Sequence, residues 1–97
     1  MNKYEAMFII KPDLSEADRK VLLAQINDSV IKNSGTVTQA SIWSEKRKLC
    51  FPIKKYREGV YYLANFSVTG EMIAKMENGY KLNENILRVL ITKLDSV

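Results

Sequence analysis

A two-residue alternation of apolar and polar side chains in residues 60–68 is the feature that most restricts the fold of this chain. Successive side chains of a β-strand point to opposite faces, so the segment predicts a strand with one face in a core. Residues 3–10 alternate in the same way. A sheet must therefore form, and its core face is expected to carry Tyr4, Ala6, Phe8, Ile10, Val60, Tyr62, Ala64, Phe66 and Val68.

The first helix is predicted by apolar side chains that recur at steps of four between residues 22 and 30. Ser15, with Asp18 three residues later, resembles the start of a capping box and marks the helix N-terminus. Gly35 is expected to end the helix, because glycine can adopt the left-handed conformation that turns the chain away. The buried stripe comprises Leu22, Leu23, Ile26 and Val30.

A second, shorter helix is predicted from about residue 70 to residue 80, with Thr69 as its N-cap. Met72, Ile73, Met76 and Tyr80 form its inner stripe. Residues 86–94 then form a last strand. Leu87, Val89 and Ile91 are expected on one face of that strand, and Arg88, Leu90 and Thr92 on the other.

The middle of the chain predicts a long hairpin. Residues 36–43 are rich in β-branched and aromatic side chains, and their alternation fails near residues 39–41, where we expect a bulge. The strand continues to Pro52, whose ring removes an amide donor and marks a strand edge or the start of a connection. Residues 54–58 are the expected tip, and Gly59 the turn residue, before the strand at 60–68 returns.

The predicted order is strand, helix, strand, strand, helix, strand. This order defines an α+β, ferredoxin-like split βαβ fold, in which two helices cover one face of a four-stranded antiparallel sheet. The first and third strands are expected to be central. With 97 residues and no visible linker or repeat, the chain predicts a single domain over residues 1–97.

Residues 46–59 concentrate positive charge on the predicted hairpin. They hold six of the fifteen Lys and Arg residues, interleaved with apolar and aromatic side chains. Cations on paired strands form a fixed array that suits a phosphate backbone, although a solvated strand edge is the alternative explanation. Alternation also divides these cations between the two faces of the strand unless a bulge redirects some of them.

Composition argues against a catalytic or metal-binding role. The chain has no histidine and one cysteine, Cys50, so it lacks the commonest general base and any Cys/His metal set. No cofactor is expected, because the sequence has no glycine-rich phosphate loop. Cys50 is expected to be a buried thiol in a cytoplasmic protein, and the net charge of +4 favours an anionic partner.

The sequence contains the spaced motifs Lys11-Pro12-Asp13, Pro52-Ile53-Lys54-Lys55 and Arg57-Glu58-Gly59, followed by residues 82–88. In this order, these motifs resemble the bacterial small-subunit ribosomal protein S-six family. The resemblance covers essentially the whole chain. It departs from the family at Glu45, where the family has glycine, at Trp43, one place before the usual tryptophan, and at Cys50 and Phe51. The similar positions are Tyr4, Glu5, Lys11, Pro12, Asp13, Gly35, Arg47, Leu49, Phe51, Pro52, Ile53, Lys54, Lys55, Arg57, Glu58, Gly59, Tyr61, Tyr62 and residues 82–88.

The resemblance implies a noncatalytic ribosomal protein that binds the central domain of small-subunit ribosomal RNA together with the eighteenth small-subunit protein. Such a protein would reside in the cytoplasm, in the ribosome. The expected RNA-binding residues are Lys3, Lys46, Arg47, Lys48, Lys54, Lys55, Tyr56, Arg57 and Arg88. The expected partner-protein face comprises Met7, Ile9, Leu63 and Leu90 on the open side of the sheet.

Three alternatives stay open at this point. Arg88 can pair with Glu5 across the open face in place of contacting RNA. The open face can be a half-exposed sheet or a homodimer contact in place of a site for a partner protein. Finally, a ferredoxin-like enzyme or ligand sensor, such as an acylphosphatase-type hydrolase, is the rival function, although Pro12 removes a donor amide where such a site would need a phosphate cradle.

Overall fold

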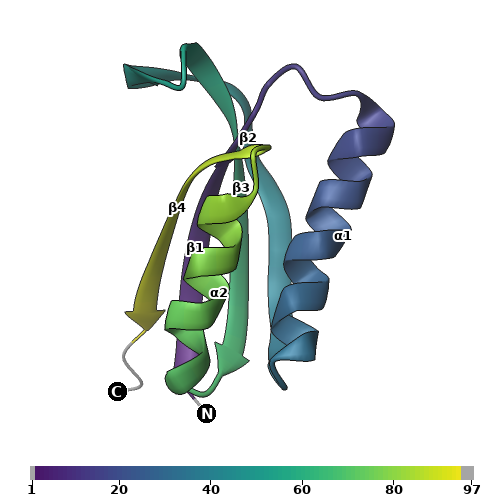
Figure 1. Ribbon diagram of the computed structural model, residues 1–97, viewed down its shortest axis with the longest axis vertical. Helices are drawn as coiled ribbons and strands as arrows, with labels where there is room; N and C mark the ends of the chain where they lie inside the picture. The colour runs from purple at the N-terminus through teal and green to yellow at the C-terminus, as the bar shows by residue number, and fades with distance from the viewer. Residues whose placement is uncertain (1, 95–97) are drawn as a thin grey trace.

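The computed structural model describes residues 2–94 and has the predicted order of elements. Four antiparallel strands form one sheet in the order β2-β3-β1-β4, so the first and third strands are central as expected. Both helices pack on one face of the sheet (Figure 1). The elements are β1 (Asn2–Ile10), α1 (Glu16–Lys32), β2 (Thr36–Ile53), β3 (Tyr56–Val68), α2 (Glu71–Leu82) and β4 (Ile86–Leu94).

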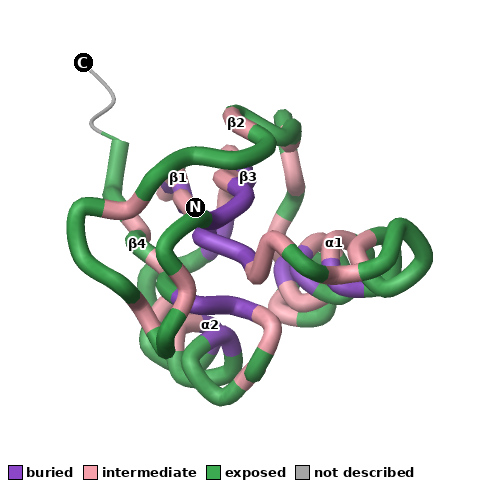
Figure 2. Tube along the Cα trace, turned by 90° about the horizontal axis from the view of Figure 1, so that it is seen from above, coloured by how far each residue is buried: buried purple, intermediate pink, exposed green. Residues whose placement is uncertain are grey.

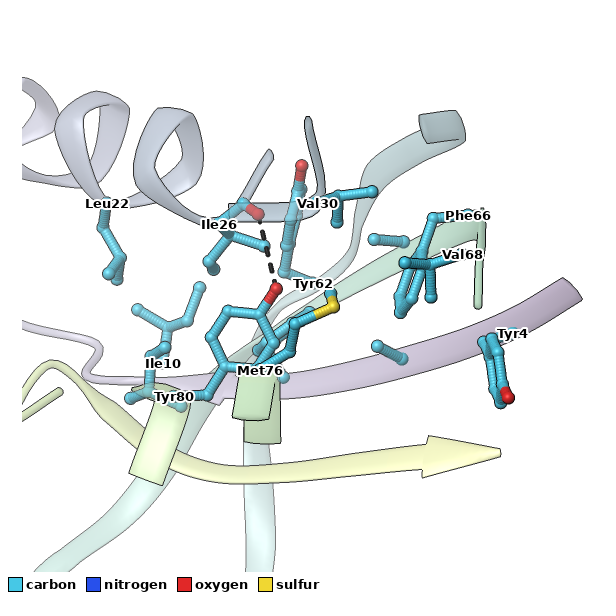
Figure 3. Packing of buried hydrophobic residues seen from close by; sticks show 14 of the residues in the cluster. Tyr4, Ile10, Leu22, Ile26, Val30, Tyr62, Phe66, Val68, Met76 and Tyr80 are labelled. Carbon is cyan, nitrogen blue, oxygen red and sulfur yellow. Dashed lines mark hydrogen bonds between the residues drawn. The ribbon is translucent and has the colours of Figure 1, made fainter. Parts of the chain in front are cut away.

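The core lies between the sheet and the helices. Figure 2 shows the buried positions gathered along the central strands and on the inner sides of α1 and α2. Phe8 is completely buried, and its ring meets the Tyr80 ring edge-on at 4.9 Å between centroids. The Tyr80 hydroxyl donates a hydrogen bond to the Ile26 carbonyl at 3.4 Å, which ties α2 to α1 (Figure 3). The predicted core faces of β1 and β3 are confirmed.

The start of α1 is as predicted, but its end is not. The Ser15 hydroxyl accepts a hydrogen bond from the Asp18 amide at 3.1 Å. The left-handed residue after the helix is Ser34, with φ of 64°, and not Gly35. Glycine is needed at 35 for another reason: a Cβ there would lie 2.7 Å from the Ser67 carbonyl oxygen and 2.8 Å from a Val30 methyl. Gly35 therefore permits close approach of helix end and sheet.

The N-terminus of α2 also differs from the prediction. Gly70, not Thr69, occupies the N-cap position, and no side chain caps the helix there. The Thr69 carbonyl accepts a hydrogen bond from the Met72 amide at 3.1 Å instead. The backbone turn thus satisfies a donor that the Thr69 hydroxyl was expected to satisfy.

A bulge changes the parity of β4. Arg88 lies opposite Ile9, whereas Ile86 lies opposite Ile10, so Leu87 is an extra residue at this point of the ladder. Ile86 consequently belongs to the core cluster, and Val89 and Ile91 pack against it. Leu87, which was expected to share their face, is only 7% exposed but lies outside this cluster. Two-residue alternation predicts a face only while the register is continuous.

The β2–β3 hairpin has a tighter turn than predicted. Lys54 and Lys55 alone form its loop, with φ of 48° and 73°, and Ile53 pairs with Tyr56. A two-residue loop with positive φ at both positions matches the twist of the flanking strands. Gly59 lies inside β3, so its assignment to the turn was wrong. The bulge expected near residues 39–41 is present slightly earlier, between Val37 and Gln39.

Candidate nucleic-acid interface

The hairpin end of β2 and β3 extends past the rest of the sheet. The ladder between β1 and β3 ends at the pair of Ile10 with Val60, so residues 56–59 of β3 pair with β2 alone. Figure 1 shows this end curling away from the helices and the other strands. The first residues of β1 and the last of β4 lie at the opposite end of the sheet. The hairpin is thus a projection from the body of the molecule.

The cations of the hairpin are exposed and form no ion pair within residues 2–94. In residues 2–94, the ion pairs join Arg19 to Glu45 and Lys81 to Glu77, and neither uses a hairpin cation. No ion pair within these residues therefore neutralises a hairpin cation, although Glu58 lies opposite Lys48 on the hairpin. The exposed hairpin cations are Lys46, Arg47, Lys48, Lys54, Lys55 and Arg57.

Register divides these cations between the faces of the hairpin. Arg47 lies opposite Gly59 and Lys48 opposite Glu58, so the two side chains point to opposite sides. The ladder then breaks between Lys48 and Ile53. Because four residues of β2 face a single residue of β3 across this break, strict alternation no longer decides the direction of the side chains beyond Lys48.

Arg47 is held on the open face by two aromatic rings. Its guanidinium carbon lies 4.6 Å from the centroid of the Trp43 ring and 5.7 Å from that of the Tyr61 ring. The two rings are themselves 5.8 Å apart. Both distances to Arg47 fall within the range of cation–π attraction.

Tyr56 connects the hairpin to the loop between β1 and α1. Its hydroxyl donates a hydrogen bond to Asp13 Oδ2 at 3.2 Å, and the Lys11 ammonium lies 5.8 Å from its ring centroid. Partial removal of the phenol from water, together with the hydrogen bond and the charge of Asp13, raises the pKa of Tyr56 above its ordinary value. The ring was expected to contact RNA, and in this structure it also braces the hairpin.

Glu45 has a structural partner on α1. The Arg19 Nη1 atom donates to both carboxylate oxygens of Glu45, at 2.9 and 3.0 Å. This ion pair draws the acidic side chain toward the helix layer, whereas Arg47 stacks on the open face. The negative charge that replaces the family's glycine is therefore neutralised locally.

The two expected RNA-binding cations outside the hairpin lie in different places. Arg88 is exposed on β4 opposite Ile9 and lines a hollow of about 160 Å³ with Leu49, Phe51 and Tyr61, so it joins the hairpin end. It forms no ion pair with Glu5, which lies opposite Thr92. Lys3 is exposed at the other end of β1, six residues or ~20 Å from Ile9 along the strand, and the structure does not bring it to the hairpin.

The expected partner-protein face forms a row across the open side of the sheet. Met7 pairs with Leu63 on one side and with Leu90 on the other. Leu90 is 60% exposed, and the other two are half-buried. Ile9 lies on the same face but is only 8% exposed, so it offers a partner little surface.

Two apolar residues of the hairpin are exposed, and one of them contradicts its expected burial. Cys50 is exposed, although it was predicted to be a buried thiol, and Phe51 is 79% exposed. Both lie in the irregular part of β2, beyond the end of the ladder between β1 and β3. Leu49 and Ile53 are half-buried and anchor this segment to the sheet.

Reasoning from the sequence missed four side chains that shape the site. Trp43, Tyr61, Asp13 and Arg19 were not among the expected site residues. Single-strand periodicity carries no information on which side chains meet across a bulge. The aromatic pair, at least, had a usable signal, because both rings flank the basic segment in the sequence.

Over residues 2–94, no cluster of His, Cys, Asp and Glu has the geometry to hold a metal ion. No helix of this part of the chain is long and apolar enough to span a membrane. The site is a charged, projecting surface next to a half-apolar sheet face, and its chemistry is that of binding.

Comparison with known proteins agrees with this geometry. A family profile described as Ribosomal protein S6 matches residues 3–93. The chain is 40% identical over 95 residues to the small ribosomal subunit protein bS6 of Thermoanaerobacter pseudethanolicus, covering 98% of this chain and 99% of that protein. It is 41% identical over 93 residues to the protein of that name from Halalkalibacterium halodurans, covering 96% and 97%.

A solved structure shows the same fold. The crystal structure of 30S ribosomal protein S6 from Thermotoga maritima superimposes with a TM-score of 0.87 at 28% sequence identity, covering 96% of this chain and 87% of that one. These matches give no support to the alternative of an acylphosphatase-type hydrolase. The chain therefore belongs to the ribosomal protein S6 family, whose members are structural, non-enzymatic components of the small ribosomal subunit.

Proposed function

We propose that this protein binds the central domain of small-subunit ribosomal RNA through its β2–β3 hairpin, together with the eighteenth small-subunit protein. It acts in the cytoplasm, within the ribosome, and performs no chemistry. Its contribution to the subunit is to neutralise and position phosphates with an array of cations whose spacing is set before RNA arrives.

The projecting hairpin carries the proposal. Six exposed cations lie within residues 46–57, and no acidic side chain among residues 2–94 forms an ion pair with any of them. Burying or pairing such charges on RNA releases counterions, and this release is the main driving force of nonspecific nucleic-acid binding. The contacts that hold the hairpin to the rest of the molecule use Glu45 and Tyr56. The hairpin cations therefore remain free to contact RNA.

Arg47 and Lys48 form the centre of the proposed contact, since they leave the hairpin on opposite sides and can meet two RNA segments. Lys54 and Lys55 at the turn extend the contact outward. Arg88 adds a cation at the base of the projection. Lys3 belongs to the proposal as a separate contact at the far end of the sheet.

The open sheet face is the proposed site for the eighteenth small-subunit protein. Met7, Leu63 and Leu90 form a continuous apolar row there, and neither helix covers it, since both helices pack on the other face. Burial of the row would remove apolar surface from water at about 25 cal/mol per Å². Leu90→Asp should abolish binding of the partner protein, and Leu82→Asp, at another exposed leucine on α2, is the matched control.

Reconstitution with the eighteenth protein and a central-domain RNA transcript tests the RNA contact. Charge reversal of Arg47 and Lys48 together should weaken assembly strongly and remove protection of specific nucleotides in a footprint. The matched control reverses Lys20 and Lys32, which are exposed on α1, outside the hairpin. Equal effects of the two double variants would show that net charge alone matters, and unchanged footprints in both would refute the assignment.

A further inference from the structure

The guanidinium of Arg47 is enclosed by two aromatic rings that come from different strands. Trp43 precedes it on β2, and Tyr61 lies on β3. The centroid distances are 4.6 Å to Trp43 and 5.7 Å to Tyr61, and the rings are 5.8 Å apart with a tilt of 53°. The three side chains are therefore one packed group on the open face.

Backbone irregularity creates this group. The register of β2 against β3 shifts between Ile42 and Ser44, so Trp43 is an extra residue, and it shifts again between Ser44 and Arg47. Arg47 then faces Gly59, which has no side chain to occupy the neighbouring position on β3. The space beside Gly59 is filled by an Ile9 methyl, which a Cβ at Gly59 would approach to 2.5 Å, so the side chain of β3 that Arg47 meets is the Tyr61 ring.

The rings leave the hydrogen-bonding capacity of Arg47 free. Arginine has five N–H donors in a planar fork, and aromatic faces engage the plane while the edges stay available. No side chain within residues 2–94 accepts a hydrogen bond from Arg47, and none forms an ion pair with it. Trp43 is itself 52% exposed, so its ring is not a component of the core.

We infer that Trp43 and Tyr61 are positioning residues, which hold the Arg47 guanidinium flat so that its donor edge is oriented for an RNA phosphate. The inference rests on the proposed function and assigns a role to two residues that the RNA itself need not touch. Fixing a flexible side chain before binding lowers the entropy that binding must remove. Loss of a ring should therefore weaken binding without removing the phosphate contact.

A double-mutant cycle measured by RNA binding tests this role. Trp43→Ala should weaken binding of the central-domain transcript, with the partner protein present, about fivefold, a change of about 1 kcal/mol at 1.36 kcal/mol per tenfold. In the Arg47→Ala background the same substitution should change affinity less than twofold, because the coupled residue is gone. Trp43→Phe, which keeps a ring, should restore most of the affinity.

Salt dependence separates positioning from general damage. Trp43→Ala should leave the slope of log affinity against log salt unchanged, because Arg47 still reaches the phosphate, whereas Arg47→Ala should reduce it by about 0.7–0.9. A reduced slope in Trp43→Ala would indicate a displaced hairpin and overturn the inference. An equal loss of affinity in both backgrounds would also overturn it, since Trp43 would then contact RNA directly.

The free protein supplies an independent readout. Trp43 is the single tryptophan, so acrylamide quenching of its fluorescence reports on the stack alone. Arg47→Ala should increase quenching, because it uncovers a face of the indole, and an unchanged value would contradict the stack. Wild-type protein that fails to bind the transcript would refute the proposed function, whereas normal wild-type binding with no coupling in the cycle would refute only the positioning role.

Discussion

The helix-covered half of the sheet and the projecting hairpin are stabilised by different means. In the covered half, Phe8, Ile10, Phe66 and Val68 are completely or almost completely buried and pack against both helices. In the hairpin, only Leu49, Ile53 and Tyr56 are half-buried between the ladder break and the turn. Polar side chains supply the remaining ties, through Glu45 to Arg19 and Tyr56 to Asp13.

The difference explains where each region can tolerate change. A close-packed core penalises any loss of volume, whereas an exposed surface does not. The hairpin exposes its cations and buries few side chains. Its shape depends on a few local features: two lysines with positive φ, one glycine and two polar contacts with the rest of the molecule. The same substitution should therefore change the free energy of unfolding more in the covered half than in the hairpin.

The largest expected effect contrasts two phenylalanines. Phe8→Ala removes a ring with no exposure and should lower the free energy of unfolding by about 3–5 kcal/mol. Phe51→Ala removes a ring that is 79% exposed and should change it by less than about 0.5 kcal/mol. Urea denaturation measures both. If Phe8→Ala is too unstable to fold, Phe8→Leu should still cost about 1.5 kcal/mol, more than the loss at residue 51.

Two glycines provide the next contrast. Gly59→Ala would place a Cβ 2.5 Å from an Ile9 methyl and should destabilise the protein by about 1–3 kcal/mol. Gly79→Ala meets no atom within 4 Å on the exposed side of α2 and should stabilise it by about 0.5–1 kcal/mol. Opposite shifts in melting temperature are the expected result. Shifts of the same sign would show that contact distance does not decide the cost at Gly59.

Alkaline pH should destabilise the protein through the buried tyrosines of the covered half. Burial raises the pKa of Tyr80 above its ordinary value of 10.0, although the hydrogen bond with Ser29 opposes this, and burial also raises the pKa of Tyr62. A raised pKa in the folded state means that this stability is fully present below pH 10 and is lost as pH rises through the folded-state pKa values.

Urea midpoints between pH 8 and 11 measure this loss. Tyr80→Phe should cost about 1 kcal/mol at neutral pH, where the hydrogen bond to Ile26 is lost, and should show a smaller decline above pH 10. Tyr56→Phe in the hairpin should also reduce the alkaline decline, because partial burial and Asp13 raise the pKa of Tyr56. A wild-type urea midpoint that rises between pH 8 and 11 would contradict the raised pKa values of Tyr62 and Tyr80 in the folded protein.

Substitution of a turn lysine by glycine should raise stability and weaken RNA binding. Lys55 has φ of 73°, a conformation that costs an L-residue roughly 1–2 kcal/mol, so Lys55→Gly should stabilise the protein by about 0.5–1 kcal/mol after the greater freedom of unfolded glycine is counted. Lys55→Ala removes the same charge and keeps the unfavourable φ. Both variants should weaken RNA binding equally, and only the glycine variant should melt at a higher temperature.

The ion pair between Arg19 and Glu45 should have the smallest effect. The Glu45 side chain is 63% exposed, and exposed pairs contribute about 0–1 kcal/mol. Glu45→Gln should therefore lower stability by about 0.5 kcal/mol in low salt and by less in 1 M salt. Glu84→Gln, at an exposed residue before β4, is the control and should show no salt-dependent change.

The fold could be predicted from the sequence because its covered half obeys simple periods. Alternation identified the core face of β1 and β3, and steps of four identified Leu22, Ile26 and Val30. Predictions failed where a local detail broke the period: the bulge that displaced Leu87, the left-handed Ser34, and the backbone cap at Gly70. These features depend on contacts with distant residues, such as the approach of Gly35 to Ser67.

The candidate site was predictable in composition and not in geometry. Charge and spacing in residues 46–59 identified the segment, and family motifs identified its class. The direction of each side chain beyond Lys48 depends on ladder breaks that no alternation rule contains. The contacts of Arg47 with Trp43, and of Tyr56 with Asp13, bring together residues that only the folded hairpin places side by side.

The salt dependence of RNA binding tests the central claim most directly. Affinity for the central-domain transcript, with the partner protein present, should fall as salt rises. Replacing Arg47 and Lys48 by alanine together should reduce the slope of log affinity against log salt by about 1.4–1.8, which corresponds to two lost phosphate contacts. Alanine at Lys20 and Lys32 should leave the slope unchanged. An unaltered slope in the hairpin variant would contradict the assignment of the hairpin as the phosphate-binding surface.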